Sequence, residues 1–173
     1  MSIDDAFAWI EQARSDARTA EFVRGGHRRL PGDVGCHVAL LCAQSFEKCI
    51  KGCMFLVGQT PTLTHGIDAR IDSILREADT RSSGDARRRL RTAFSARAVR
   101  GAIRVLLAWT PGAARADEPN YEYPWRRDHA AELEIPCGHA LFGDVDDHEE
   151  WARIARELSE EAAKILDTVR RRP

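Results

Sequence analysis

Apolar residues recur at steps of three and four along most of this chain, and this spacing restricts the fold more than any other feature of the sequence. In the segment from Ile3 to Val23 the stripe consists of Ala6, Ile10, Ala13, Ala17 and Ala20. Such a period places apolar side chains on one face of an α-helix, whereas a half-buried β-strand alternates at every second residue. The glycine and proline turns of this chain lack flanking alternation, so we predict an all-α protein.

Four further helices are predicted by the same spacing and by the turn residues between the segments. They extend from Val34 to about Val57 with Asp33 as the N-cap, from His65 to Ala78, from Asp85 to Trp109, and over about 146-170. In the helix from Asp85 to Trp109, the residues expected to face inward are Leu90, Phe94, Ala98 and Val105. We expect an up-and-down bundle of four to five helices in a single domain, 1-173, with an irregular loop over about 110-145 before the last helix.

The helix from Val34 to Val57 is apolar around more of its circumference than one core face needs. Leu40, Phe46, Ile50 and Phe55 lie outside the stripe that contains its other apolar residues. Such a helix is either central in the bundle or also in contact with a partner chain. We therefore expect a homodimer or a hetero-oligomer.

The composition is that of an ordinary soluble domain, with 43% hydrophobic residues and a formal net charge of −1. The first residues lack a basic stretch followed by an apolar one, and no run reaches the roughly 20 apolar residues that cross a bilayer. A cytoplasmic location without a membrane is expected. Four of the five cysteines fall in the second helix, where free thiols serve as small apolar residues.

Charge is segregated along the chain. Residues 81–104 contain eight arginines and one acid, Asp85, whereas residues 144–161 contain eight acids and only Arg153 and Arg156 as cations. The arginines could follow a phosphate backbone, since the guanidinium group forms forked contacts with phosphate. Alternatively, the acidic segment could neutralise them within the fold or across a dimer.

Several short motifs together resemble one family. The second helix contains Gln44-x-x-Glu47-Lys48 followed by Lys51, and the first contains Trp9-x-x-x-Ala13-x-x-Asp16. Gly58, Pro61 and Thr64-His65 form the turn before the third helix, and Tyr121-Glu122-Tyr123-Pro124-Trp125 follows later with Glu122 in place of an arginine. Over roughly the first 125 residues, this pattern resembles the HEPN (higher eukaryotes and prokaryotes nucleotide-binding) domain family.

The resemblance implies a helical bundle that commonly dimerises, and active members of the family cut RNA without a metal through an Arg-x(4–6)-His motif. No histidine of this chain has an arginine five, six or seven positions before it. The resemblance therefore implies a catalytically degenerate binding module with no cofactor or metal. Its expected partners are RNA, a nucleotide or a nucleotidyltransferase-like protein, in a defence or toxin–antitoxin-like complex.

The alternative is a metal-independent ribonuclease with a non-standard site formed by Arg126, Arg127 and His129. Binding residues are expected in three groups, each with a structural alternative. Lys48 and Lys51 could grip phosphate or form salt bridges within the helix, while an aromatic group could stack unpaired bases or anchor its loop. The candidate residues beyond these lysines are the aromatic Tyr121, Tyr123 and Trp125 and the basic Arg87, Arg88, Arg91, Arg100 and Arg104.

Overall fold

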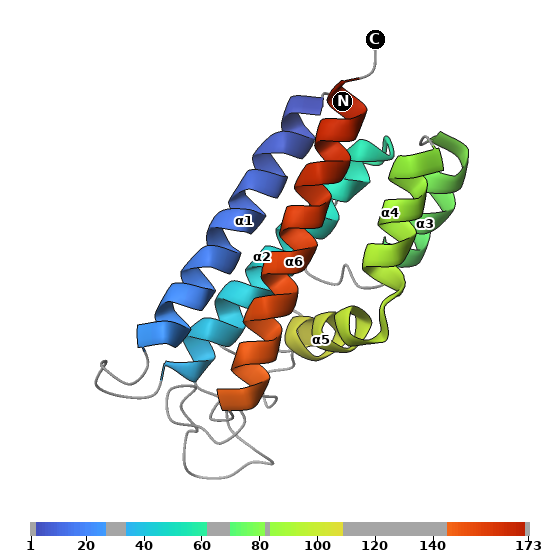
Figure 1. Cartoon of the computed structure of the whole chain (residues 1–173). Helices are drawn as coiled ribbons and strands as arrows, with labels where there is room; N and C mark the ends of the chain where they lie inside the picture. The colour runs from blue at the N-terminus through green and yellow to red at the C-terminus, as the bar shows by residue number, and fades with distance from the viewer. Residues whose placement is uncertain (1–2, 27–33, 62–69, 82–83, 109–144, 172–173) are drawn as a thin grey trace.

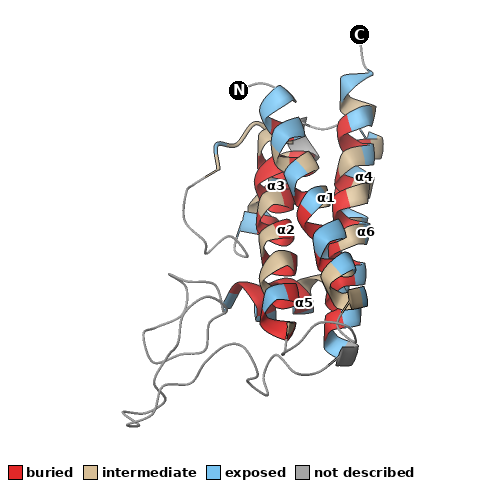
Figure 2. Cartoon of the chain, turned by 90° about the vertical axis from the view of Figure 1, so that its left-hand side faces the viewer, coloured by how far each residue is buried: buried red, intermediate tan, exposed pale blue. Residues whose placement is uncertain are grey.

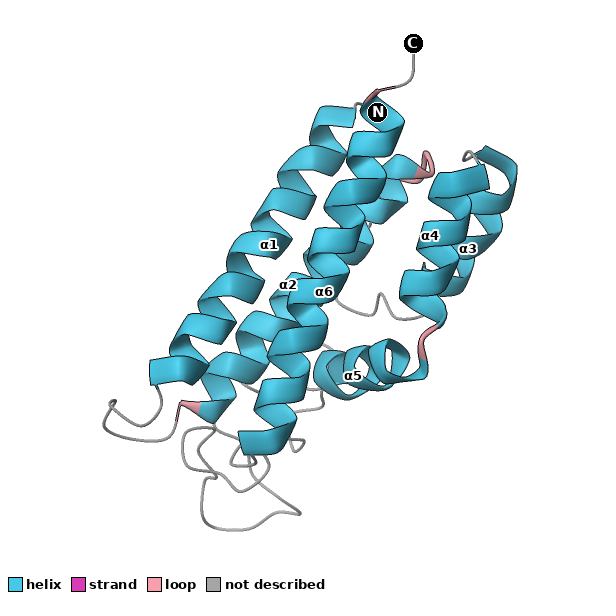
Figure 3. Cartoon of the chain, in the orientation of Figure 1, coloured by secondary structure: helices cyan, strands magenta, loops and turns pink. Residues whose placement is uncertain are grey.

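The computed structural model describes residues 3–26, 34–61, 70–81, 84–108 and 145–171. Within these residues there are six helices and no strand (Figure 3), so the prediction of an all-α bundle is confirmed. The helices are α1 (Ile3–Gly26), α2 (Gly35–Leu56), α3 (Arg70–Arg81), α4 (Gly84–Ser95), α5 (Arg97–Ala108) and α6 (Val145–Arg170).

Three long helices, α1, α2 and α6, lie side by side and form the main layer of the bundle (Figure 1). Helix α1 runs opposite to the other two, and α3 and α4 form a hairpin-like pair beside them. The short helix α5 lies crosswise below the α3–α4 pair in this view and contacts α2, α4 and α6. No described helix is both long and apolar enough to cross a membrane.

Helix α2 is the centre of the bundle. It contacts α1, α3, α5 and α6, and most of its residues are buried (Figure 2). Of the two explanations for its all-round apolar character, a central position accounts for it within one chain. The expectation of an oligomer therefore has to rest on another surface.

Small residues let α1 and α2 approach closely. The predicted stripe of α1 is confirmed, because Ala6, Ile10, Ala13, Ala17 and Ala20 are all fully buried. Across from it, a Cβ built on Gly52 would lie only 2.6 Å from Ile10 Cγ1. The short distance between these two helix backbones thus depends on the absence of a side chain at Gly52.

The predicted helix from Asp85 to Trp109 is wrong in one respect, because the structure breaks it at Ala96 into α4 and α5. Leu90 and Phe94 are buried as expected, but Ala98 is exposed and Val105 is 40% exposed. The residues of α5 that enter the core instead are Ala102, Ile103, Leu106 and Leu107.

The geometry of a straight helix explains the break. At 3.6 residues per turn, the 20 residues between Ala86 and Leu106 rotate the side-chain direction by about 200° beyond full turns. Ala86 and Leu106 would then face nearly opposite sides, yet both are buried in the same core. Breaking the helix at Ala96 turns α5 across the bundle and allows both apolar faces to point inward.

The last helix begins and ends close to the predicted bounds, and its stripe of Trp151, Ile154, Leu158, Ala162 and Ile165 is buried. The predicted start of the third helix at His65 and the predicted loop over about 110-145 lie outside the described residues.

Candidate nucleic-acid interface

The two motifs on the first and second helices contact each other. Lys48 Nζ donates to Asp16 Oδ2 at 2.5 Å, and Gln12 donates to the other oxygen of the same carboxylate at 3.0 Å. Nearby, the Ser45 hydroxyl donates to the carbonyl of Ala13 at 2.9 Å. These residues join α1 to α2 with polar contacts at the place where their apolar faces meet.

Lys51 lies still deeper. Its side chain is 5% exposed, its Nζ lies 2.5 Å from Glu47 Oε1 in the preceding turn, and the same Nζ lies 5.1 Å from the centroid of the Trp9 ring. An ammonium group so enclosed is stabilised by the carboxylate and by the negative face of the ring. Lys51 thus forms the salt bridge within its helix, whereas Lys48 forms one with α1, so both ammonium groups have a carboxylate partner inside the fold.

The arginine-rich surface has a different character. Arg87, Arg88 and Arg91 are exposed on α4 and line one open hollow of about 750 Å³ together with Gly84 and Thr92. No acidic residue is among these lining residues. We name this feature the basic hollow. It brings together three of the five arginines that the sequence selected.

Asp85 is the acid nearest to this surface in the sequence, and it serves two arginines. It accepts from Arg88 at 2.5 Å and from Arg89 at 3.1 Å. The Arg88 side chain nevertheless remains 75% exposed, and an ion pair so open to water contributes little to stability. Its guanidinium group can therefore exchange one oxygen partner for another at small cost.

Arg100 does not belong to the basic hollow. Its Nε donates to the carbonyl of Phe94 at 2.8 Å, near the end of α4, and its guanidinium contacts Asp72 of α3 at 2.7 Å. The hydrogen bond and charge of Arg100 lower the pKa of Asp72 below its ordinary value. Arg100 thus connects three helices. Arg104 is exposed on α5 and is not among the residues that line the basic hollow.

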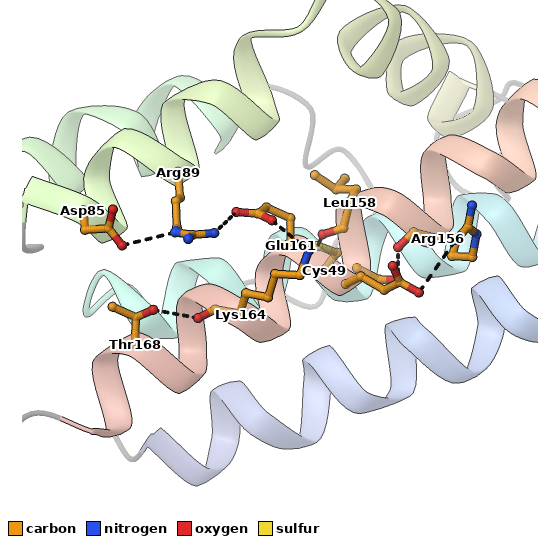
Figure 4. A network of polar contacts seen from close by, with 10 residues as sticks. Cys49, Asp85, Arg89, Arg156, Leu158, Glu161, Lys164 and Thr168 are labelled. Atoms are coloured by element: carbon orange, nitrogen blue, oxygen red, sulfur yellow. Dashed lines mark hydrogen bonds and ion pairs between the residues drawn. The ribbon is translucent and has the colours of Figure 1, made fainter.

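One contact between the arginine-rich segment and the acidic one is formed as expected. Arg89 of α4 donates to Glu161 of α6 at 2.7 Å, and Lys164 Nζ lies 3.5 Å from the second oxygen of Glu161 (Figure 4). The hydrogen bond to Glu161, followed by that to Asp85, raises the pKa of Arg89. Arg89 was not among the arginines predicted to bind, although its four-residue spacing from Asp85 indicated an ion pair within the helix.

Other charged residues of α6 pair with α1. Glu149 contacts Arg24 of α1 at 3.2 Å, and Arg156 of α6 reaches Glu21 of α1 at 2.8 Å. The residues of the acidic segment therefore connect α6 to two neighbours, α1 and α4, and none of them lines the basic hollow.

The remaining candidates, namely Arg126, Arg127, His129, Tyr121, Tyr123 and Trp125, lie outside the described residues. Within the part that is described, His37 is exposed and His148 is buried, with its ring centroid 5.6 Å from that of Trp151. No group of three or more histidine, cysteine, aspartate or glutamate residues in that part could hold a metal ion.

The four cysteines of α2 are free and buried. Burial, with a smaller effect of the Glu21 charge, raises the pKa of Cys42 to about 12. A hydrogen bond with Cys53 and burial raise the pKa of Cys49 as well. Thiols held in the protonated form are poor nucleophiles, so Cys42 and Cys49 act as small apolar side chains.

No protein-family model matches this chain, and neither a curated protein nor a solved structure is detectably similar to it.

Proposed function

We propose that this chain is a helical binding module for RNA, of the catalytically degenerate HEPN-like kind that its motifs resemble. The observation that carries the proposal is the basic hollow. Three exposed arginines on neighbouring turns of α4, Arg87, Arg88 and Arg91, line it together. A surface of this kind fits the repeated negative charge of a phosphate backbone.

The expected binding is electrostatic, because each phosphate that an arginine neutralises releases condensed counterions. Affinity should fall steeply as salt rises and should depend little on base sequence. Both properties distinguish phosphate binding from a purely structural role of these arginines.

The test is a titration of structured RNA at several salt concentrations. Arg87→Ala and Arg91→Ala should each weaken binding, and each lost phosphate contact should reduce the slope of log affinity against log salt by about 0.7 to 0.9. Arg70→Ala is the matched control, since Arg70 is an exposed arginine of α3 outside the hollow. Unchanged affinity and slope in the α4 variants would refute the proposal.

The alternative function is tested by incubating the protein with the same RNA in the presence of a chelator. If the wild-type protein cleaves RNA without metal and a His129→Ala variant does not, the binding-only proposal is wrong. The protein would then be a ribonuclease that uses Arg126, Arg127 and His129. Intact RNA is the expected result, because the Arg-x(4–6)-His spacing is missing from the sequence.

The proposal includes a homodimer, which we assign to the outer face of α1. Phe22 is 82% exposed there and borders a shallow hollow lined also by Glu11, Arg14, Ser15, Arg18 and Thr19. A two-fold contact would cover the same aromatic side chain on both copies and could match the mixed charges of this face. A nucleotidyltransferase-like partner stays an expectation from the family resemblance.

A further inference from the structure

A cleft of about 460 Å³ lies between α4, the start of α5 and α6. Its size falls within the range of roughly 300 to 1,000 Å³ that holds small organic groups. Five of the residues that line it are apolar, namely Ala93, Ala96, Val99, Ile154 and Leu158. Because the alanine side chains are small, they leave room on the α4 side for a flat ligand to contact the apolar surface.

The cleft and the basic hollow adjoin each other. Arg88 and Thr92, which are one turn apart on α4, line both of them. A ligand whose charged part occupies the basic hollow therefore needs to cross only these two side chains to place an apolar part in the cleft.

Arg89 gives the cleft a fixed cationic plane. Its guanidinium is held by Asp85 on its own helix and by Glu161 across the cleft (Figure 4). The side chain is 39% exposed, and its two carboxylate partners restrict its rotation, so a base that stacks on the guanidinium costs little further conformational freedom. Guanidinium planes of this kind stack on unpaired nucleic-acid bases.

Carboxylates lie among the lining residues of the same cleft. Glu157 and Glu160 belong to them, and each has an arginine of α6 within 4 Å, Arg153 and Arg156 respectively. A carboxylate accepts several hydrogen bonds, so these groups can also accept from the amino group of a base. Arg88 and Lys164 also line the cleft, so it offers hydrogen-bond donors as well as acceptors to a base.

We propose that the cleft receives an unpaired base from the RNA strand whose phosphates lie in the basic hollow. This inference rests on the proposed function and narrows it, because it selects single-stranded or looped RNA over regular duplex. In a duplex, the bases are stacked and paired and cannot turn outward into such a cleft without loss of that pairing.

The test fills the cleft and leaves the basic hollow unchanged. Ala93→Leu and, separately, Ala96→Leu add an apolar side chain inside the cleft, and Ala98→Leu adds the same volume at an exposed position of α5 outside it. Ala96 is itself exposed, so its variant should keep the fold even if the half-buried Ala93 tolerates leucine less well. Thermal unfolding followed by circular dichroism checks this.

Binding is measured with a single-stranded RNA that contains the fluorescent base 2-aminopurine and with a duplex of the same length. We expect the cleft variants to weaken single-strand binding on the order of tenfold and to abolish the fluorescence change on binding. Duplex affinity and the salt slope should stay at the wild-type values, as should all properties of Ala98→Leu.

Different failures have different meanings. If Arg87→Ala weakens binding but the folded cleft variants bind single strands as wild type does, the proposed function stands and the base site is refuted. If the cleft variants weaken duplex and single-strand binding equally, the base site is also refuted. If the wild-type protein binds no RNA, both proposals fall together.

Discussion

At the scale of single residues, Gly52 shows how one missing side chain sets the distance between two helices. A Cβ at this position would lie 2.6 Å from Ile10 Cγ1 and 3.3 Å from the carbonyl oxygen of Ala6. Alanine would favour the helix itself by about 1 kcal/mol, but overpacking of a filled core costs typically ~1–3 kcal/mol. Because Ile10 is fully buried and has little room to move, we expect the packing cost to exceed the helical gain.

Gly52→Ala should therefore lower the free energy of unfolding by about 1 kcal/mol, measured by urea denaturation. Gly101→Ala is the matched control, since Gly101 is exposed inside α5 and its Cβ would meet nothing within 4 Å. That variant should gain up to about 1 kcal/mol from helix propensity alone. A stabilising effect of both substitutions would contradict the close contact of α1 with α2.

The Glu47–Lys51 pair makes a second prediction at this scale. Both side chains are almost fully buried, so removing one of them takes the ion pair away from a charge that stays buried. Lys51→Met should cost about 3 to 5 kcal/mol of unfolding free energy, whereas the double variant Glu47→Leu/Lys51→Met should recover most of that loss. If Lys51→Met kept full stability and instead weakened RNA binding, the lysine would have the phosphate-binding role that its buried position disfavours.

At the scale of elements, the junction between α4 and α5 is informative because no glycine or proline marks it. Ala96 is non-helical, and its carbonyl accepts the first hydrogen bond of α5, from the amide of Arg100 at 3.0 Å. Ala96 is thus in the N-cap position, where alanine offers no side-chain oxygen to the free amides of the first turn.

Ala96→Asp should stabilise the protein by about 0.5 to 2 kcal/mol, because the carboxylate would cap α5. Ala96→Leu, the comparison variant, introduces a good helix former without a cap and should give no such gain. If α4 and α5 formed one continuous helix, Ala96→Leu would be more stable than Ala96→Asp, since aspartate is unfavourable in a helix interior. Thermal and urea unfolding of the two variants therefore decide between a broken and a continuous helix.

At the scale of the whole molecule, the question is how one chain covers its apolar surface. The central helix α2 contacts α1, α3, α5 and α6, so its apolar surface is covered within a single chain. The large apolar side chain that stays most open among the described residues is that of Phe22.

We expect a dimer in light scattering of the wild-type protein, and Phe22→Glu should shift it to the monomer. The helix content and melting behaviour should stay unchanged, because Phe22 makes no part of the buried core. Phe7→Glu is a less suitable probe, since the Arg170 guanidinium already lies 4.4 Å from the centroid of that ring. A wild-type monomer at high concentration would remove the dimer from the proposal.

Among the described residues, helical period by itself indicated most of the helical segments, and it determined which faces of α1 and α6 enter the core. These are local properties, since a stripe such as Ala6, Ile10, Ala13 and Ala17 has one face to bury whatever it packs against. The sequence also identified the arginines of the basic hollow, because Arg87, Arg88 and Arg91 avoid the apolar positions of their helix.

Only the tertiary structure decided the rest, since it depends on residues far apart in the chain. The break at Ala96 follows from the need to bury Ala86 and Leu106 in one core, although the local sequence favours a continuous helix. The internal partners of Lys48 and Lys51, and the cleft that joins Arg89 to Glu161, arise where α2 meets α1 and where α4 meets α6. A sequence pattern specifies the face of a helix, but packing selects which other helix that face meets.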